Sequence, residues 1–273
     1  MMQNRILWLD NLKGFLILIV IFGHTILFSS NQGDTNIIYR YICSFWMAVF
    51  MFTSGFASYK PDLNISIIKK RFAQLIIPFV AWSVILCAIN LDIHVENLIL
   101  YPVNSVWFLW TLFIINSIVV LLVISAYKLN INEEFICLIF CCLLLILSKI
   151  IADNRIFALN LISIHLIYFL IGFHTRKYFE KVVKLPSIVW LIGGLLFVVM
   201  AYFNKGDYMP FGLPHFLHVV YDIICAIFSF SLFIPIFVRF CDYNVLHISK
   251  LGGADAWYLC NTHCYLFPIA KIF

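Results

Sequence analysis

The chain has 273 residues, of which 64% are hydrophobic and only 11% are charged, and its mean hydropathy is +1.01. This composition excludes an ordinary soluble globular domain and predicts a polytopic membrane protein. The net charge of +5 is small and falls on short loops, so it indicates how the chain lies in the membrane and argues against a nucleic-acid partner.

Continuous apolar runs of about twenty residues predict transmembrane helices, because the strands of a membrane barrel are shorter and alternate in polarity. We therefore expect an all-α, polytopic transmembrane helical bundle that forms a single domain over residues 1–273. About nine spans are predicted, at residues 8–29, 37–59, 72–91, 105–126, 134–151, 157–175, 187–203, 217–239 and 254–273. The last span stops at Phe273 without a polar tail, which leaves open a tenth helix in a full-length form.

The basic residues of the loops predict the orientation of the bundle. With the N-terminus in the cytoplasm, twelve Lys and Arg residues fall on the inner side and five on the outer side, and Lys13 lies inside the first span. Because short cytoplasmic loops of membrane proteins carry an excess of Lys and Arg, we expect a cytoplasmic N-terminus.

The first span holds Lys13 and His24, eleven residues apart in a nearly continuous apolar stretch. At about 100° per residue they are separated by about three turns, so both side chains share one face, about 16 Å apart. Ionisable residues inside a membrane are costly and normally face a protein interior or a wet cavity. A neutral imidazole is suited to taking a proton from a hydroxyl, and a cation at the inner end suits an anionic ligand. The alternative is a buried histidine bonded to a carbonyl and a lysine that reaches the interface.

Neighbouring residues support this helix face. Asp10 and Asn11 precede Lys13 by one turn or less, and Asp10 has the spacing to pair with Lys13. Gly14 and Gly23 leave room for the close approach of a neighbouring helix or a ligand.

The nine cysteines fall mostly inside apolar runs, where cysteine acts as a small hydrophobic residue. Cys260, His263 and Cys264 lie close together near the end of the chain, but this single grouping is weak support for a metal site. We therefore expect no metal and no bound cofactor. His263 has two interpretations, a second polar group of the site or a partner of a backbone carbonyl.

Six segments together carry a resemblance. LDNLKGFLILIVIFGHT contains a basic residue, Lys13, ten further residues and then His24. The other five segments are FWMAVFMFTSGF at 45–56, KKRFAQLIIPFVAWS at 69–83, SVWFLWTLF at 105–113, YFLIGFHTRKYFE at 168–180 and LGGADAWYLCNTHC at 251–264. In this order they resemble the motifs of the acyltransferase-3 family of integral membrane acyltransferases, and the resemblance covers nearly the whole chain.

Three positions depart from the family pattern. Trp46 begins Trp46-Met47-Ala48 where the family often has His-Met-Pro, and Ser105 or Val106 stands near another family histidine. Asp255 stands near a serine of the last motif. We expect these departures to affect acceptor recognition more than the pair of Lys13 and His24.

The resemblance implies a membrane O-acyltransferase, most simply an O-acetyltransferase. Its donor would be acetyl-CoA, or another short acyl-CoA, from the cytoplasm. Its acceptor would be a hydroxyl of a cell-surface carbohydrate or of a lipid-linked precursor, and the protein would be multi-pass in a bacterial inner membrane. His24 would be the general base, and Lys13, Arg71 and Lys70 would hold or orient the donor. Membrane lipids and the carbohydrate acceptor are the expected partners.

Several of these residues keep two interpretations. Arg71 and Lys70 either contact donor phosphates or serve topology and lipid headgroups. Ser54, which precedes Gly55, either belongs to the site or lets two helices pack closely. Trp107 either supports the site or belongs to an interfacial aromatic belt.

Two other functions compete with acyl transfer. An intramembrane lysine and histidine also suit a proton-coupled transporter or flippase of glycan precursors, although no repeated halves are visible. A non-catalytic family member that only binds a glycan enzyme is the third hypothesis, because the second and last motifs are altered.

Overall fold

The computed structural model describes residues 6–29, 36–90, 101–102, 106–151, 155–204 and 215–241. Within these ranges every regular element is a helix. The α-helices are α1 (Leu7–Ser29), α2 (Ile37–Cys43), α3 (Trp46–Ser58), α4 (Ser66–Arg71), α5 (Ile77–Asn90), α7 (Trp107–Leu129), α8 (Glu133–Ile150), α9 (Leu159–Lys177), α10 (Phe179–Val183), α11 (Ser187–Phe203) and α12 (His215–Phe240). A π-helix (Phe72–Ile76) joins α4 to α5, and a 3-10 turn (Ile156–Ala158) leads into α9.

Eight of the nine predicted spans lie within the described residues except for residues 91 and 105 at two of their ends, and the described part of each coincides with helical structure. The ninth, 254–273, lies outside the described residues. Five helical segments are long and apolar enough to cross a membrane: Leu7–Leu27, Ile37–Ser58, Trp107–Leu129, Ile156–Lys177 and Leu217–Phe240. The predicted all-α, polytopic architecture is thereby confirmed, whereas the cytoplasmic N-terminus stays a prediction.

The predicted span 37–59 is not one straight helix, because the chain breaks at Ser44 and Phe45 into α2 and α3. The hydroxyl of Ser44 donates to the carbonyl oxygen of Arg40 at 2.9 Å and so completes the end of α2. Phe45 then leaves helical geometry with φ −135° before α3 begins. The sequence around the break is apolar, so hydropathy alone gives no sign of it.

The π-helix between α4 and α5 has a local cause in Pro78. Proline has no N–H group, and in an α-helix its ring clashes with the carbonyl four residues earlier. That carbonyl belongs to Gln74, which lies inside the π-helical segment. The wider π turn accommodates this clash, and such turns are frequent at functional sites.

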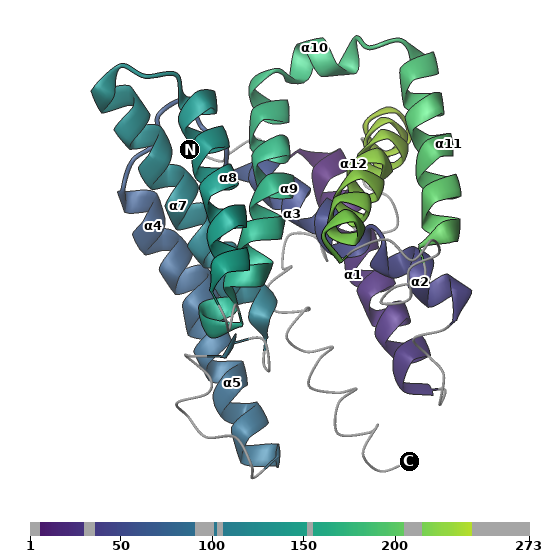
Figure 1. The fold of residues 1–273 in the computed structure, drawn as a ribbon, viewed down its shortest axis with the longest axis horizontal. Helices are drawn as coiled ribbons and strands as arrows, with labels where there is room; N and C mark the ends of the chain where they lie inside the picture. Colours follow the sequence, from purple (N-terminus) through teal and green to yellow (C-terminus); the bar gives the residue numbers. More distant parts are fainter. Residues whose placement is uncertain are drawn as a thin grey trace.

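Helices α3 and α9 cross at the centre of the bundle, with α4, α5, α7 and α8 on one side and α1, α2, α11 and α12 on the other (Figure 1). The crossing is close because two glycines face the backbone of the partner helix. A Cβ atom at Gly55 would collide with the carbonyl group of Phe169, and one at Gly172 would collide with that of Phe52. Small residues are used in this way where membrane helices pack backbone to backbone.

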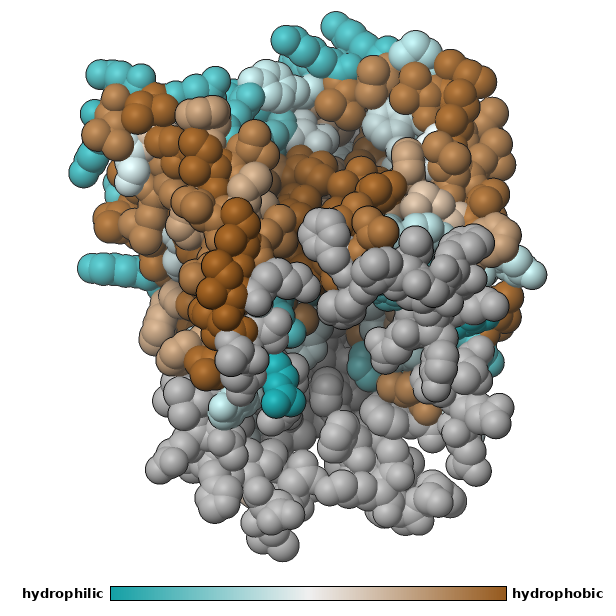
Figure 2. Space-filling model, viewed as in Figure 1, coloured by the Kyte–Doolittle hydropathy of each residue, from teal (hydrophilic) through white to brown (hydrophobic). Residues whose placement is uncertain are grey.

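Polar residues gather at one end of the bundle. Figure 2 shows hydrophobic residues over most of the coloured surface and hydrophilic residues along the edge that carries α10. Basic residues lie in and beside the helix ends, among them Lys128, Lys177, Lys181 and Lys184. This polar end is the one that the loop charges predict to be cytoplasmic.

Candidate functional site

The first helix carries Lys13 and His24, the two ionisable residues predicted to form the site. Helix α1 is continuous from Leu7 to Ser29, so Lys13 and His24 lie on one unbroken helix, as predicted. Regular helix geometry therefore puts both on nearly the same face, about 16 Å apart along the axis. Both side chains are partly exposed. On the same helix Leu16 and Val20 are buried and Leu18 is exposed.

The imidazole of His24 is oriented by its own helix. Its Nδ1 atom lies 2.8 Å from the carbonyl oxygen of Val20, one turn earlier. A carbonyl oxygen can only accept a hydrogen bond, so Nδ1 carries the proton. In the neutral ring the lone pair is then on Nε2, which is the atom able to take a proton from a substrate.

Trp46, the first residue of α3, forms one side of the surroundings of His24. The two ring centroids are 5.3 Å apart and the planes are inclined by 34°. Gly23 makes this approach possible, because a Cβ there would come within 3.0 Å of Trp46 Cζ3 and 3.2 Å of Ile42 Cγ2. The expected role of Gly23 in close helix approach is confirmed. Trp46 is also a position where the sequence departs from the family pattern. Because the Trp46 ring contacts His24, this departure alters the surroundings of the histidine and is not limited to acceptor recognition.

Asn11 connects two helices at the other end of α1. Its side chain is 1% exposed, and Nδ2 donates to the carbonyl oxygen of Cys241, just after α12, at 2.6 Å. Asn11 therefore has a structural role between α1 and α12. The predicted pair of Asp10 and Lys13 stays a prediction.

Arg71 lies at the junction of α3, α4 and α7. Its guanidinium donates to Gln74 Oε1 and to Ser58 Oγ, both at 3.4 Å. Ser58 Oγ also accepts from Asn116 Nδ2 of α7 at 2.8 Å and donates to the carbonyl oxygen of Ser54 at 2.8 Å. Arg71 is thus placed toward α7, whereas Lys13 and His24 are on α1.

The remaining predicted residues are spread over the bundle. Lys70 is exposed beside Arg71. Ser54 is buried and contributes its backbone carbonyl to Ser58, while Gly55 next to it serves the packing of α3 on α9. His263 lies outside the described residues, as does Asp255.

Trp107 does not simply face lipid, because its ring packs against His165 of α9. The centroids of Trp107 and His165 are 5.3 Å apart, and His165 is 8% exposed. Nδ1 of His165 lies 2.8 Å from the carbonyl oxygen of Leu161, one turn earlier on α9. His165 falls well inside a predicted span. Ionisable residues inside a membrane are costly and often functional, so the reasoning that identifies His24 as a candidate applies to His165 as well.

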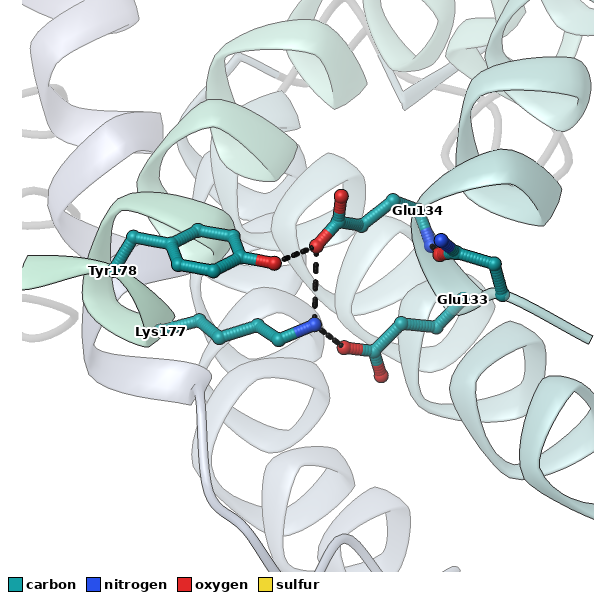
Figure 3. Close-up of polar contacts among 5 residues, drawn as sticks. Glu133, Glu134, Lys177 and Tyr178 are labelled. Carbon is teal, nitrogen blue, oxygen red and sulfur yellow. Dashed lines mark hydrogen bonds and ion pairs between the residues drawn. The ribbon is translucent and has the colours of Figure 1, made fainter.

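A second polar cluster joins α8 to the end of α9 (Figure 3). Lys177 Nζ lies 2.7 Å from Glu133 Oε1 and 3.0 Å from Glu134 Oε1. Tyr178, just beyond α9, donates to Glu134, and this bond raises the pKa of the phenol and keeps it a donor.

The same cluster contains the one group of potential metal ligands in the described part of the chain. Ligand atoms of Glu133, Glu134 and His174 lie within 4.8 Å of one another. Lys177 already places a cation between the two carboxylates, so a metal ion would have to displace it.

The comparisons with known proteins agree with the resemblance. A family model described as an acyltransferase domain matches residues 6–256. No curated protein and no solved structure matches the chain significantly. The matched region contains Lys13, His24, Arg71 and Trp107, and ends before His263. The chain is a multi-pass membrane protein and belongs to the acyltransferase-3 family of integral membrane acyltransferases.

Proposed function

We propose that this protein is an O-acyltransferase of a bacterial inner membrane. It moves an acetyl or other short acyl group from acyl-CoA to a hydroxyl of a cell-surface carbohydrate or its lipid-linked precursor. The family supports acyl transfer in general. The observation that carries the proposal is that His24 is partly exposed while its Nδ1 is held by the Val20 carbonyl. A buried histidine bonded to a carbonyl would fit the non-catalytic alternative, whereas a partly exposed one offers a basic Nε2 to a substrate.

The reaction then follows from ordinary acid–base chemistry. Nε2 of His24 takes the proton of the acceptor hydroxyl as its oxygen attacks the thioester carbonyl carbon. The new C–O bond forms, the C–S bond breaks, and the CoA sulfur leaves with the electron pair. The imidazolium returns its proton to that sulfur, so the enzyme ends in its starting state and no further reactant is needed.

Lys13 binds the donor on the cytoplasmic side of His24. The separation of about 16 Å along α1 suits a long ligand whose phosphates lie at one end and whose thioester lies at the other. Phosphates are anions, and a lysine ammonium is a compact cation that binds them. Arg71 and Lys70 are basic residues of the same polar end of the bundle and extend this attraction for the donor.

The test is acyl transfer in membranes supplied with radiolabelled acetyl-CoA, read as alkali-labile label in the cell-envelope carbohydrate fraction. We expect His24→Ala to lower the rate about 10²- to 10⁴-fold, the range that a general base supplies. Thr25→Ala is the matched control, because Thr25 is exposed and its hydroxyl bonds to the Ile21 carbonyl of its own helix, at 2.9 Å. Undiminished transfer by His24→Ala would contradict the proposed base.

A further inference from the structure

Arg176, near the end of α9, lies over a ring of the core. Its Cζ atom is 5.1 Å from the centroid of Phe56, a residue of α3 that is 1% exposed. The Phe56 ring contacts Trp8 of α1 edge-on, with centroids 5.0 Å apart, and Phe179 of α10, with centroids 5.2 Å apart. Trp8 and Phe179 stack on each other with centroids 5.8 Å apart and planes inclined by 9°. The guanidinium therefore rests on aromatic side chains that join three helices.

Arg176 differs from the next residue in its charge partners. Lys177 is neutralised by Glu133 and Glu134. Among the residues that the structure describes, the Arg176 guanidinium makes neither an ion pair nor a hydrogen bond, and its side chain is partly exposed. A guanidinium has five N–H donors in a planar fork that matches the oxygens of a phosphate. The Phe56 ring lies beneath the guanidinium and orients these N–H donors. In the described part of the chain the donors have no anionic partner.

The position of Arg176 links it to the helix that carries His24. Helices α1 and α3 touch at both ends: His24 meets Trp46 at the start of α3, and Trp8 meets Phe56 near its end. Arg176 lies at the second of these contacts. Lys13 lies between Trp8 and His24 along α1. From the polar end inward, Arg176 of α9 lies beside the Trp8–Phe56 contact of α1 and α3, and Lys13 and then His24 follow along α1.

We propose that Arg176 binds a phosphate group of the acyl-CoA donor at the cytoplasmic end of α1 and α3. This inference rests on the proposed function, and it adds Arg176 to the donor-binding residues on the side of α3 that faces α1. Arg71 is on the α7 side, where it donates to Ser58 Oγ, which also accepts from Asn116 of α7. A lipid headgroup is the other source of phosphate, but Phe56 is a buried core residue, and headgroups lie around the perimeter of a bundle.

The test is equilibrium binding of CoA and of 3′-dephospho-CoA to the purified full-length chain in phospholipid-free detergent. We expect Arg176→Gln to weaken CoA binding about ten- to hundredfold, the effect of losing charge-assisted hydrogen bonds. Arg176→Lys should recover part of the affinity, because it keeps the charge and loses the fork. A larger loss for CoA than for 3′-dephospho-CoA identifies the 3′-phosphate, and an equal loss identifies the pyrophosphate.

Lys181→Gln is the matched control. Lys181 is also a cation over an aromatic ring, with Nζ 5.4 Å from the Tyr178 centroid, but it is exposed and outside the core contact. Its replacement should leave CoA affinity within twofold of the wild type.

Two results would overturn the assignment of Arg176. One is wild-type CoA affinity in an Arg176→Gln protein that elutes and unfolds like the wild type. The other is a defect that appears only in vesicles with anionic phospholipid, which would assign Arg176 to lipid. Failure of the wild type itself to bind CoA would instead contradict the proposed donor, so the two failures are distinguishable. His24→Ala should still bind CoA.

Discussion

His24 and His165 occupy equivalent surroundings on two different helices. In each, Nδ1 lies 2.8 Å from the carbonyl oxygen four residues earlier, and in each the imidazole centroid lies 5.3 Å from that of a tryptophan. Both rings therefore carry the proton on Nδ1 when neutral, because a carbonyl only accepts. The difference is burial, since His165 is 8% exposed whereas His24 is partly exposed.

Aromatic residues of α3 and α7 lie near both histidines. Trp46 and Phe50 are one turn apart on α3. Phe50 meets Phe108 edge-on, with centroids 5.0 Å apart, and Phe108 is followed by Trp107, with centroids 6.2 Å apart. Phe50 is fully buried, whereas Trp46 and Trp107 are partly exposed, so each histidine packs against a tryptophan at the edge of the core.

Replacing His165 should affect stability more than donor binding. His165→Ala removes a buried ring and its contact with Trp107, and we expect a cost of about 1–3 kcal/mol in the free energy of unfolding. Thermal unfolding in detergent measures this, with CoA affinity as the second readout. A stable His165→Ala protein that has lost CoA affinity would show that His165 belongs to the donor site.

The glycines of the α3–α9 crossing should not tolerate a methyl group. In Gly55→Ala the Cβ would meet the Phe169 carbonyl, and in Gly172→Ala it would meet that of Phe52, both backbone atoms that cannot turn aside. We expect each change to cost about 2–3 kcal/mol or to prevent folding. Gly194→Ala is the control, because its nearest atom is the side-chain Leu232 Cδ1 at 3.5 Å, an ordinary contact. Equal unfolding temperatures for all three variants would contradict the close crossing.

Replacing Ser58 should lower the stability of the fold, because its hydroxyl joins α3 to Arg71 of α4 and to Asn116 of α7. Ser58→Ala leaves Asn116 Nδ2, on a side chain that is 2% exposed, without its acceptor and removes a partner of Arg71. We expect a cost of about 1–3 kcal/mol, the penalty for a buried polar group that loses its partner. Ser117→Ala is the control, since the Ser117 hydroxyl bonds to the Phe113 carbonyl of its own helix, at 2.8 Å. A cost for Ser117→Ala as large as that for Ser58→Ala would argue against the junction.

Lys177 should keep metal ions out of the Glu133–Glu134–His174 cluster. In Lys177→Gln the two carboxylates lose their cation, but the side chains of Lys177, Glu133 and Glu134 are 28%, 25% and 39% exposed, so we expect a cost below about 1 kcal/mol. Zinc should then stabilise Lys177→Gln, because carboxylate and imidazole atoms are suitable zinc ligands. Unfolding temperatures with and without zinc measure this. Equal stabilisation of the wild type would show that Lys177 does not exclude the ion.

Hydropathy was sufficient to predict most of the helices. The predicted span 187–203 coincides with α11, and the predicted span 134–151 differs from α8 by one residue at each end. Apolar runs of this length have one stable form in a bilayer, since a helix satisfies its own backbone hydrogen bonds. Hydropathy does not predict the break at Ser44, because the break depends on backbone geometry within an apolar run.

The sequence by itself also determined the pairing of Lys13 and His24 on one helix face, because that pairing depends only on helix periodicity and on a helix without interruption. Which residues of other helices meet α1 was decided only by the tertiary structure. Trp46 reaches His24, Arg176 reaches the Trp8–Phe56 contact, and Arg71 and Asn116 both bond to Ser58. These contacts follow from the close α3–α9 crossing and from which face of α3 each residue occupies. Short-range periodicity carries no information about how helices that are distant in sequence pack together.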